Sequence, residues 1–191
     1  MSNPDTEDEG EVEHETVRVI GCDIYFYGDV DRANAFDFID AFKKLEVDLL
    51  KKSIELEGYN PMIRVHIHSD GGDVFSGLSM MDMLRSSRVK VVTIAEGTCC
   101  SAATLILLGG CKRLMGRHAF VLIHQLSTGF FGKYKDLKDE MKTCKKVMAT
   151  LKTLYDDSTT IPKDKLSEFM KRDIYLGYEE CLKYEIVHGH S

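Results

Sequence analysis

The chain has 191 residues, a length that suits one domain with a sizeable core. Its residues are 43% hydrophobic and 29% charged, as in ordinary globular proteins, and no apolar run reaches the roughly 18 residues that span a bilayer. The sequence has no basic stripe and starts with acidic, polar residues. These features argue against a membrane protein, a nucleic-acid-binding protein and a secreted or imported protein, so we expect it in the cytoplasm.

The N-terminal segment, residues 1–16, is strongly acidic. Residues 1–15 hold seven Asp and Glu and no Lys or Arg, whereas the whole chain has a net charge of −6, so the remaining chain is nearly neutral. A segment that repels itself and has little to bury is predicted to be disordered. It could serve as a solubilising leader or as a flexible gate or partner arm. Residues 17–191 are predicted to form a single folded domain.

Strand and helix patterns alternate along that domain. Apolar periodicity and turn residues predict strands at 17–27 (one or two), 62–68, 89–95, 113–115 and 119–123. They predict helices at 31–52, 74–86, 101–108, 133–157, 163–171 and 178–184. Such alternation is typical of an α/β fold that is built from repeated βαβ units around a largely parallel sheet.

The helix predicted at 133–157 has a narrow apolar stripe. The stripe follows heptad spacing and consists of Tyr134, Leu137, Met141, Cys144, Met148, Leu151 and Tyr155. A seam of this kind often packs against one neighbouring helix. The neighbour could belong to another subunit, or the stripe could pack on the helix's own domain.

Two glycine-containing turns, at 69–73 and 97–103, each follow a predicted strand and open a helix. The N-terminus of a helix presents unpaired N–H groups and a partial positive charge, which suit an oxyanion. Glycine lets the backbone approach a ligand closely. Ser101 lies in the second turn, where it could act as a nucleophile or simply cap the following helix.

Other polar residues are ambiguous by themselves. His124 ends the strand predicted at 119–123 and could be catalytic or structural, and Asp173 is an isolated acid. His66 and His68 share one face of a strand and could bind zinc, but no third ligand stands at a familiar spacing. We therefore expect no metal and no cofactor. The six cysteines lack CxxC spacing and are expected to be reduced thiols, the adjacent pair at 99 and 100 serving as small apolar fillers.

Four segments, in order, resemble the proteolytic subunit of the Clp protease family. They are IHSDGGDVFSGLSMMDML, VTIAEGTCCSAATLILL, FVLIHQ and KRDIYLGYEECLKYEIVHG. The resemblance covers roughly residues 25–189. It implies a ClpP/crotonase-like fold with a long protruding handle helix, preceded at about 129–133 by a strand that aligns substrate and joins rings.

The resemblance also implies a function, that of a serine endopeptidase. Ser101 corresponds to the nucleophile, His124 to the general base and Asp173 to the acid that orients the histidine. The backbone N–H groups of Gly72 and Ala102 correspond to the oxyanion hole. The implied partners are further copies of the chain in a heptameric ring that can stack as a tetradecamer, peptide or unfolded-protein substrates, and an AAA+ unfoldase that alone would use ATP.

The chain departs from the family pattern at several positions. Asp70 replaces a proline before the double glycine, His68 replaces an asparagine, and two cysteines at 99 and 100 replace a small or apolar pair. The surface that docks the ATPase in the family is apolar, but here it offers Arg64, His66 and Ser86, so docking is an open question. Two alternatives to peptidase activity are an assembly or adaptor subunit with little or no turnover and a crotonase-like acyl-CoA enzyme.

Overall fold

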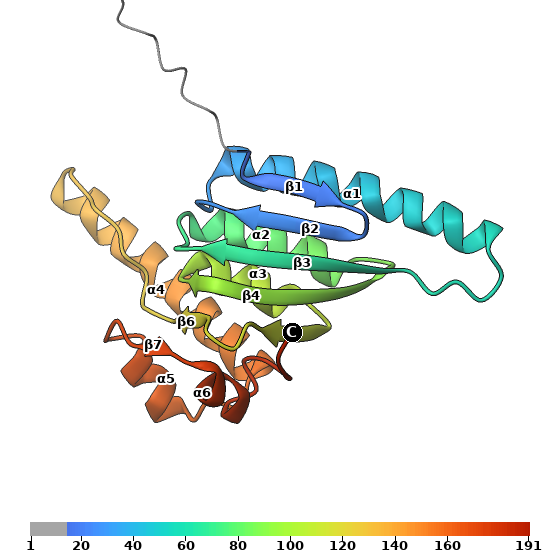
Figure 1. Cartoon of the computed structure of the whole chain (residues 1–191). Helices are drawn as coiled ribbons and strands as arrows, with labels where there is room; N and C mark the ends of the chain where they lie inside the picture. Colours follow the sequence, from blue (N-terminus) through green and yellow to red (C-terminus); the bar gives the residue numbers. More distant parts are fainter. Residues whose placement is uncertain (1–14) are drawn as a thin grey trace, which may run out of the picture.

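The structure, a computed structural model, describes residues 15–191 (Figure 1). The predicted disorder of residues 1–16 therefore falls almost wholly outside the described residues. The strands are β1 (Val17–Ile20), β2 (Asp23–Tyr27), β3 (Met62–Ser69), β4 (Lys90–Cys100), β5 (Lys112–Met115), β6 (Phe120–Leu122) and β7 (Tyr175–Leu176). The helices are α1 (Arg32–Glu55), α2 (Val74–Arg85), α3 (Ala102–Gly109), α4 (Tyr134–Ser158), α5 (Lys163–Phe169) and α6 (Tyr178–Lys183).

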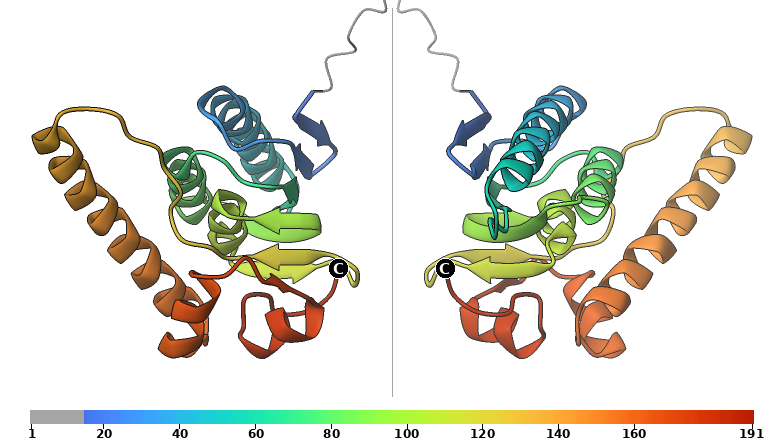
Figure 2. Two further views of the ribbon diagram at one scale, coloured as in Figure 1. Left: turned by 90° about the vertical axis from the view of Figure 1, so that its left-hand side faces the viewer. Right: turned by 90° about the vertical axis from the view of Figure 1, so that its right-hand side faces the viewer.

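The strands form one mixed sheet, in the order β1-β2-β3-β4-β6-β7, with β5 also paired to β4. Strands β2, β3 and β4 are parallel neighbours, as are β4 and β6. The pairs β1–β2 and β6–β7 are antiparallel. Helices α1, α2 and α3 lie on one side of β1–β4 and leave the other side of these strands open (Figures 1 and 2). The expected α/β architecture with a largely parallel sheet is confirmed.

Packing follows the apolar periodicity of each element. The core includes Phe26, Phe38 and Phe42, which are 0% exposed. Burying aromatic side chains of this size is the main favourable contribution to such a fold. Within the described residues, none of the helices has both the length and the apolar character that a bilayer crossing requires.

Strand β4 is longer than the sequence predicts. The predicted strand ends at 95, but β4 continues through Gly97 to Cys100, so the expectation of a turn at 97–100 is wrong. Gly97 has φ +53, and a Cβ there would lie 2.0 Å from Nδ1 of His68. The glycine thus accommodates an irregularity in the β3–β4 register, between Ile67 and Ser69, instead of ending the strand.

The apolar stripe of helix α4 is buried in the chain's own core at one end and exposed at the other. Leu151 and Tyr155, in its C-terminal half, are buried in the chain's own core, whereas Tyr134 and Met141 are 80% and 58% exposed. The N-terminal half projects away from the rest of the molecule (Figure 2). Residues 129–133 pair with no strand of the same chain within residues 15–191, and the strand expected there, which would join rings, stays a prediction.

Candidate active site

Ser101 and His124 follow the carboxyl ends of two adjacent strands. In the parallel pair of β4 and β6, Cys100 lies opposite Leu122. The backbone N–H of Ser101 then donates to the carbonyl of Leu122 at 2.9 Å. Because His124 comes two residues after Leu122, the sheet register brings together two residues that are 23 positions apart in the chain.

Asp173 approaches from the other side of β6. Strand β7 pairs antiparallel with β6, with Leu122 opposite Tyr175. Asp173 comes two residues before this pair, and both Asp173 and His124 line one cavity at this end of the sheet. A hydrogen bond from the Gln125 N–H to the Met170 carbonyl, 2.8 Å long, holds the two segments together beyond the strand ends. Ser101 and His124 thus line one cavity at the carboxyl ends of these strands, and His124 and Asp173 line a second.

Ser101 occupies a strained turn between β4 and α3. Its φ of 55° and ψ of −125° lie outside the regions that most side chains adopt. Its hydroxyl makes no capping hydrogen bond to α3, so the interpretation of Ser101 as a plain helix cap is wrong. A sharp strand-to-helix turn of this kind exposes the hydroxyl of a nucleophile.

Neighbouring groups support this turn. A Cβ on Gly71 would lie 2.5 Å from the Cβ of Ser101, so only glycine permits the close approach of the two turns. The Thr104 hydroxyl donates to the Ser101 carbonyl at 2.6 Å and is hydrogen-bonded in turn to the buried Tyr155 hydroxyl on α4. The sequence pattern indicated Tyr155 as apolar packing only, so its polar contact was missed.

Two backbone N–H groups beside Ser101 are available to a ligand. Those of Gly72 and Ala102 donate to no protein acceptor within residues 15–191. Ala102 begins α3, where the first N–H groups have no partner inside the helix. Gly72 is held against Val30, whose carbonyl oxygen would lie 2.3 Å from a Cβ at that position. Both donors border the same cleft as Ser101 and His124.

His124 is not engaged with the other two residues in this conformation. Its Nδ1 lies 2.6 Å from the carbonyl of Gln125, and since a carbonyl only accepts, Nδ1 carries the proton. An imidazole whose single proton is on Nδ1 has its lone pair on Nε2, which is the tautomer that a general base needs. No hydrogen bond within the described residues links His124 to Ser101 or to Asp173.

Two adjoining cavities meet at His124, and together we call them the candidate cleft. The smaller, about 270 Å³, contains Ser101 and both free N–H groups and is lined by apolar side chains from Val74, Leu105 and Leu151. The larger, about 640 Å³, contains Asp173 and Lys171. Asp70 and His124 line both cavities. Together, the two cavities are lined by all three predicted catalytic residues.

The two adjacent cysteines are poor nucleophiles. Burial raises the pKa of Cys100 to about 11, with a further contribution from the negative charge of Asp70. Complete burial also raises the pKa of Cys99. Because the thiolate is the reactive form, neither side chain competes with Ser101 as a nucleophile at neutral pH. Their burial agrees with the interpretation that they are apolar fillers.

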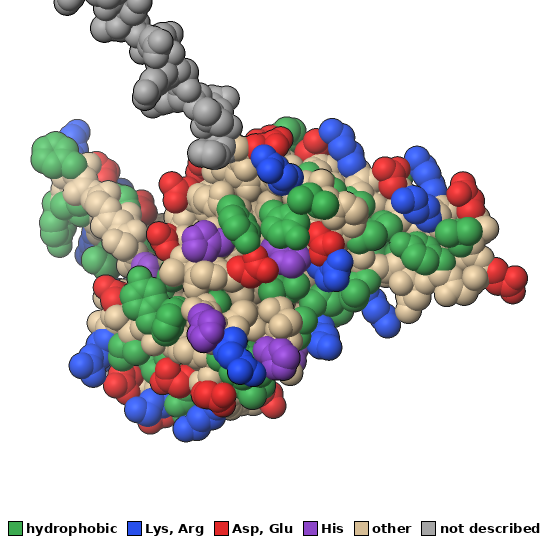
Figure 3. Space-filling model, in the orientation of Figure 1, with side chains coloured by type: hydrophobic (Ala, Val, Ile, Leu, Met, Phe, Trp, Pro, Cys, Tyr) green, Lys and Arg blue, Asp and Glu red, His purple; other side chains and the backbone are tan. Residues whose placement is uncertain are grey.

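The histidine pair on β3 takes part in a different arrangement, which we call the outer-face network. His66 Nε2 lies 3.0 Å from Asp23 and its Nδ1 lies 2.8 Å from Glu96. Arg64 bonds both oxygens of Asp23, each at 2.6 Å, and the Tyr27 hydroxyl donates to Glu96. Histidine side chains gather on this open face (Figure 3). Within residues 15–191, no group of three His, Cys, Asp or Glu is placed to hold a metal ion.

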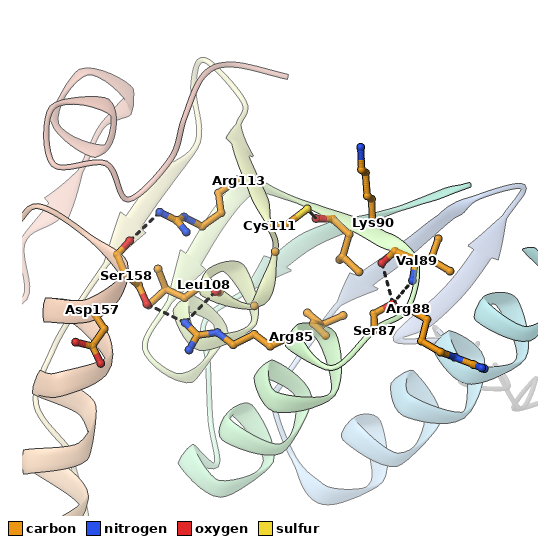
Figure 4. A pocket seen from close by; sticks show the side chains of 14 residues that line it. Arg85, Ser87, Arg88, Val89, Lys90, Leu108, Cys111, Arg113, Asp157 and Ser158 are labelled. Atoms are coloured by element: carbon orange, nitrogen blue, oxygen red, sulfur yellow. Dashed lines mark hydrogen bonds between the residues drawn. The ribbon is translucent and has the colours of Figure 1, made fainter. Parts of the chain in front are cut away.

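A further cavity, about 590 Å³, lies between the ends of α2, α3 and α4 (Figure 4). The guanidinium of buried Arg113 donates to the carbonyl of Ser158 and to two carbonyls beyond α6, each at 2.8 Å. Arg85 donates to the Ser158 hydroxyl at 2.8 Å and to the Leu108 carbonyl at 3.3 Å. Both arginines therefore close the C-terminal ends of helices, which is a structural role.

Comparisons with known proteins agree with the geometry. The family model described as Clp protease matches residues 25–189. The chain is 35% identical over 136 residues to an ATP-dependent Clp protease proteolytic subunit from Deinococcus radiodurans, covering 69% of this chain and 67% of the relative. Its fold is similar to that of a ClpP1 mutant from Listeria monocytogenes, with a TM-score of 0.75 and 23% identity, over 88% of this chain and 90% of the other. The chain belongs to the Clp protease family.

Proposed function

We propose that the chain is a serine endopeptidase that cleaves peptides and unfolded polypeptides inside an oligomeric chamber. The observation that carries the proposal is the state of Ser101: a strained turn, an uncapped hydroxyl and two unpaired N–H groups beside it in one cleft. A buried or enclosed polar group normally finds a partner. Groups that are held in place without one are suited to a substrate.

In the proposed reaction, the Ser101 Oγ attacks the scissile carbonyl carbon while Nε2 of His124 takes the hydroxyl proton. The N–H groups of Gly72 and Ala102 stabilise the oxyanion of the tetrahedral intermediate. His124 then gives its proton to the leaving amine, which departs and leaves an acyl group on Ser101. A water molecule, activated by His124, hydrolyses this ester and restores the serine.

Asp173 completes the proposed triad after a change of side-chain position. The Nδ1–H of His124 stops donating to the Gln125 carbonyl and donates to the Asp173 carboxylate, which stabilises the imidazolium that forms during attack. The shared cavity supports this pairing, because His124 and Asp173 both line it. Catalytic hydrogen bonds often tighten only when substrate is bound.

Self-assembly into a ring is part of the proposal. Phe131 is fully exposed, and Tyr134 and Met141 continue the apolar surface along the projecting half of α4. An apolar surface of this kind usually marks a protein interface. On the open face, Arg64 and His66 are committed to the outer-face network. This supports our further proposal that the usual ATPase ring does not dock there through apolar contacts.

The direct test is hydrolysis of short fluorogenic peptides and of unfolded casein by the assembled protein. We expect turnover by the wild-type chain, none by Ser101→Ala, and wild-type turnover by the matched control Ser79→Ala, whose serine lies exposed on α2. Assembly mass is measured on the same samples. Wild-type rings that cleave neither substrate would instead indicate an assembly or adaptor subunit. Saturable binding of an acyl-CoA without peptide cleavage would indicate a crotonase-like enzyme.

A further inference from the structure

Asp70 places a carboxylate at the centre of the candidate cleft. It lies two residues before Gly72, whose N–H is one of the two proposed oxyanion donors, and it lines both cavities beside His124. The Thr98 hydroxyl donates to Asp70 Oδ1 at 2.9 Å and fixes the position of the carboxylate. The second carboxylate oxygen is left for other contacts.

The charge of Asp70 has no counter-ion in the protein. Within residues 15–191, no Lys, Arg or His nitrogen lies within 4.0 Å of its carboxylate, although Lys171 lines the larger cavity. The negative charge extends into the cleft, where it contributes to the raised pKa of Cys100. In contrast, Asp23 and Glu46 are each paired with a cationic side chain. A fixed, unpaired carboxylate in a substrate cleft attracts cations from the substrate.

We propose that Asp70 is a specificity-determining residue that favours substrates with Lys or Arg close to the scissile bond, an inference that rests on the proposed peptidase function. The remaining pocket beside Ser101 is lined mainly by apolar side chains, so this preference acts in addition to apolar recognition. The carboxylate is exposed, so the gain is that of a solvent-screened ion pair, about fivefold in kcat/KM at low salt.

The test uses matched peptides that differ at a single position. Lysine is placed in turn at each of three positions before and three positions after the scissile bond, and each peptide has a partner with neutral Nε-acetyl-lysine. Cleavage sites are identified by mass spectrometry, and kcat/KM is measured at low and high ionic strength. We expect lysine to be favoured about fivefold at one or two positions. The preference should decline at high salt, because roughly 1 M salt screens charges beyond about 3 Å.

Two variants assign the preference to Asp70. In Asp70→Asn, the kcat/KM of the lysine peptide divided by that of its acetyl-lysine partner should fall to about one. Asp70→Lys should cleave a glutamate peptide with a higher kcat/KM than its glutamine partner. The control Asp48→Asn removes the same charge from the surface of α1 and should keep the lysine preference. Labelling of Ser101 by a fluorophosphonate shows that each variant has folded its cleft.

The outcomes separate this inference from the proposed function. If the wild-type protein cleaves the lysine and acetyl-lysine peptides with equal kcat/KM at every tested position, the role of Asp70 is overturned and the peptidase proposal stays intact. The same conclusion follows if Asp70→Asn retains the lysine preference, or if it slows both peptides of a pair equally. If wild-type rings cleave no peptide and resist the fluorophosphonate, the peptidase proposal fails, and the inference about Asp70 fails with it.

Discussion

Two polar clusters lie on the sheet and differ in how completely their members are paired. In the outer-face network, both nitrogens of His66 contact carboxylates, and Asp23 is contacted by both Arg64 and His66. In the candidate cleft, Ser101 and Asp173 make no side-chain hydrogen bond within the described residues, and His124 contacts only the Gln125 carbonyl. Paired groups stabilise a fold, whereas positioned but unpaired groups have capacity left for a substrate.

The pKa directions agree with this difference. Burial alone would raise the pKa of Asp23, but its hydrogen bonds to Arg64 and His66, with their charges, outweigh burial and lower it. Burial together with Glu96 raises the pKa of Tyr27 to about 12, which keeps that hydroxyl protonated as a donor. Within the network, the pKa shifts thus favour an ionised Asp23 and a protonated Tyr27 at neutral pH.

The largest expected effect comes from Ser101→Gly. We predict a fall in kcat of about 10⁶-fold, because the nucleophile is lost. We also predict that the free energy of unfolding rises by about 1 kcal/mol, because glycine adopts φ 55° without strain. Peptide kinetics and urea unfolding measure the two quantities. Ser79→Gly is the control, since glycine inside α2 should lower stability. A less stable Ser101→Gly would show that the turn is not strained.

Asp173→Asn tests whether the acid acts on His124. We expect kcat to fall by about 10⁴-fold, since loss of the carboxylate removes stabilisation of the imidazolium. The free energy of unfolding should change by less than about 0.5 kcal/mol, because the side chain is exposed. Steady-state kinetics measures the change in kcat, and thermal unfolding measures the change in stability. A loss below tenfold would mean that the Gln125 carbonyl alone orients the ring.

His66→Ala tests the paired cluster. We predict that the free energy of unfolding falls by about 1–3 kcal/mol, because Glu96 and Asp23 lose a partly buried partner. Cleavage of short peptides should continue at the wild-type rate per folded subunit. The exposed His118→Ala serves as the control and should leave stability unchanged. Equal stability of all three proteins would contradict the structural role of the network.

The smallest expected effect concerns Asp73, a paired group that lies between Gly72 and Val74 of the cleft lining. Its carboxylate caps α2 by accepting from the Ser76 N–H at 2.8 Å, so Asp73→Ala should cost about 1 kcal/mol at neutral pH. Burial alone would raise the pKa of Asp73, but hydrogen bonds from Ser76 lower it. With a folded pKa below the unfolded value of about 3.9, the contribution is complete above that value.

This stabilisation is therefore lost as the pH falls through the folded pKa of Asp73. The difference in unfolding free energy between wild type and Asp73→Ala should shrink as urea titrations are taken from pH 7 towards pH 2.5. A difference that grows in acid would have the wrong sign for a carboxylate with a lowered pKa.

Local patterns in the sequence predicted most of the fold. Apolar periodicity was sufficient to predict helices α1, α2 and α4, and the pattern of β-forming residues predicted the strands from β1 to β6. The position of Ser101, between a strand and a helix in a glycine-containing turn, was also evident. These features depend on neighbours within about ten residues, which a sequence displays directly.

Other features depend on contacts that no local pattern displays. Strand β7 has two residues, too few for a period, yet it brings Asp173 towards His124. Gly97 resembled a turn signal, but the reason for this glycine is the His68 ring packed against it from the neighbouring strand, a contact that the local sequence does not display. The bond from Thr98 to Asp70 joins residues 28 positions apart. The proposed triad could be assigned only through the resemblance of ordered motifs, because its three residues are far apart in the chain and no local pattern relates them.

The central claim is that Ser101 is a reactive nucleophile in the assembled protein. Treatment with a fluorophosphonate, followed by intact-mass measurement and peptide mapping, tests it directly. We predict one adduct per subunit, located on Ser101, with labelling lost in Ser101→Ala and slowed in a His124→Ala variant. An adduct on a different serine, or rings that remain unlabelled, would contradict the account.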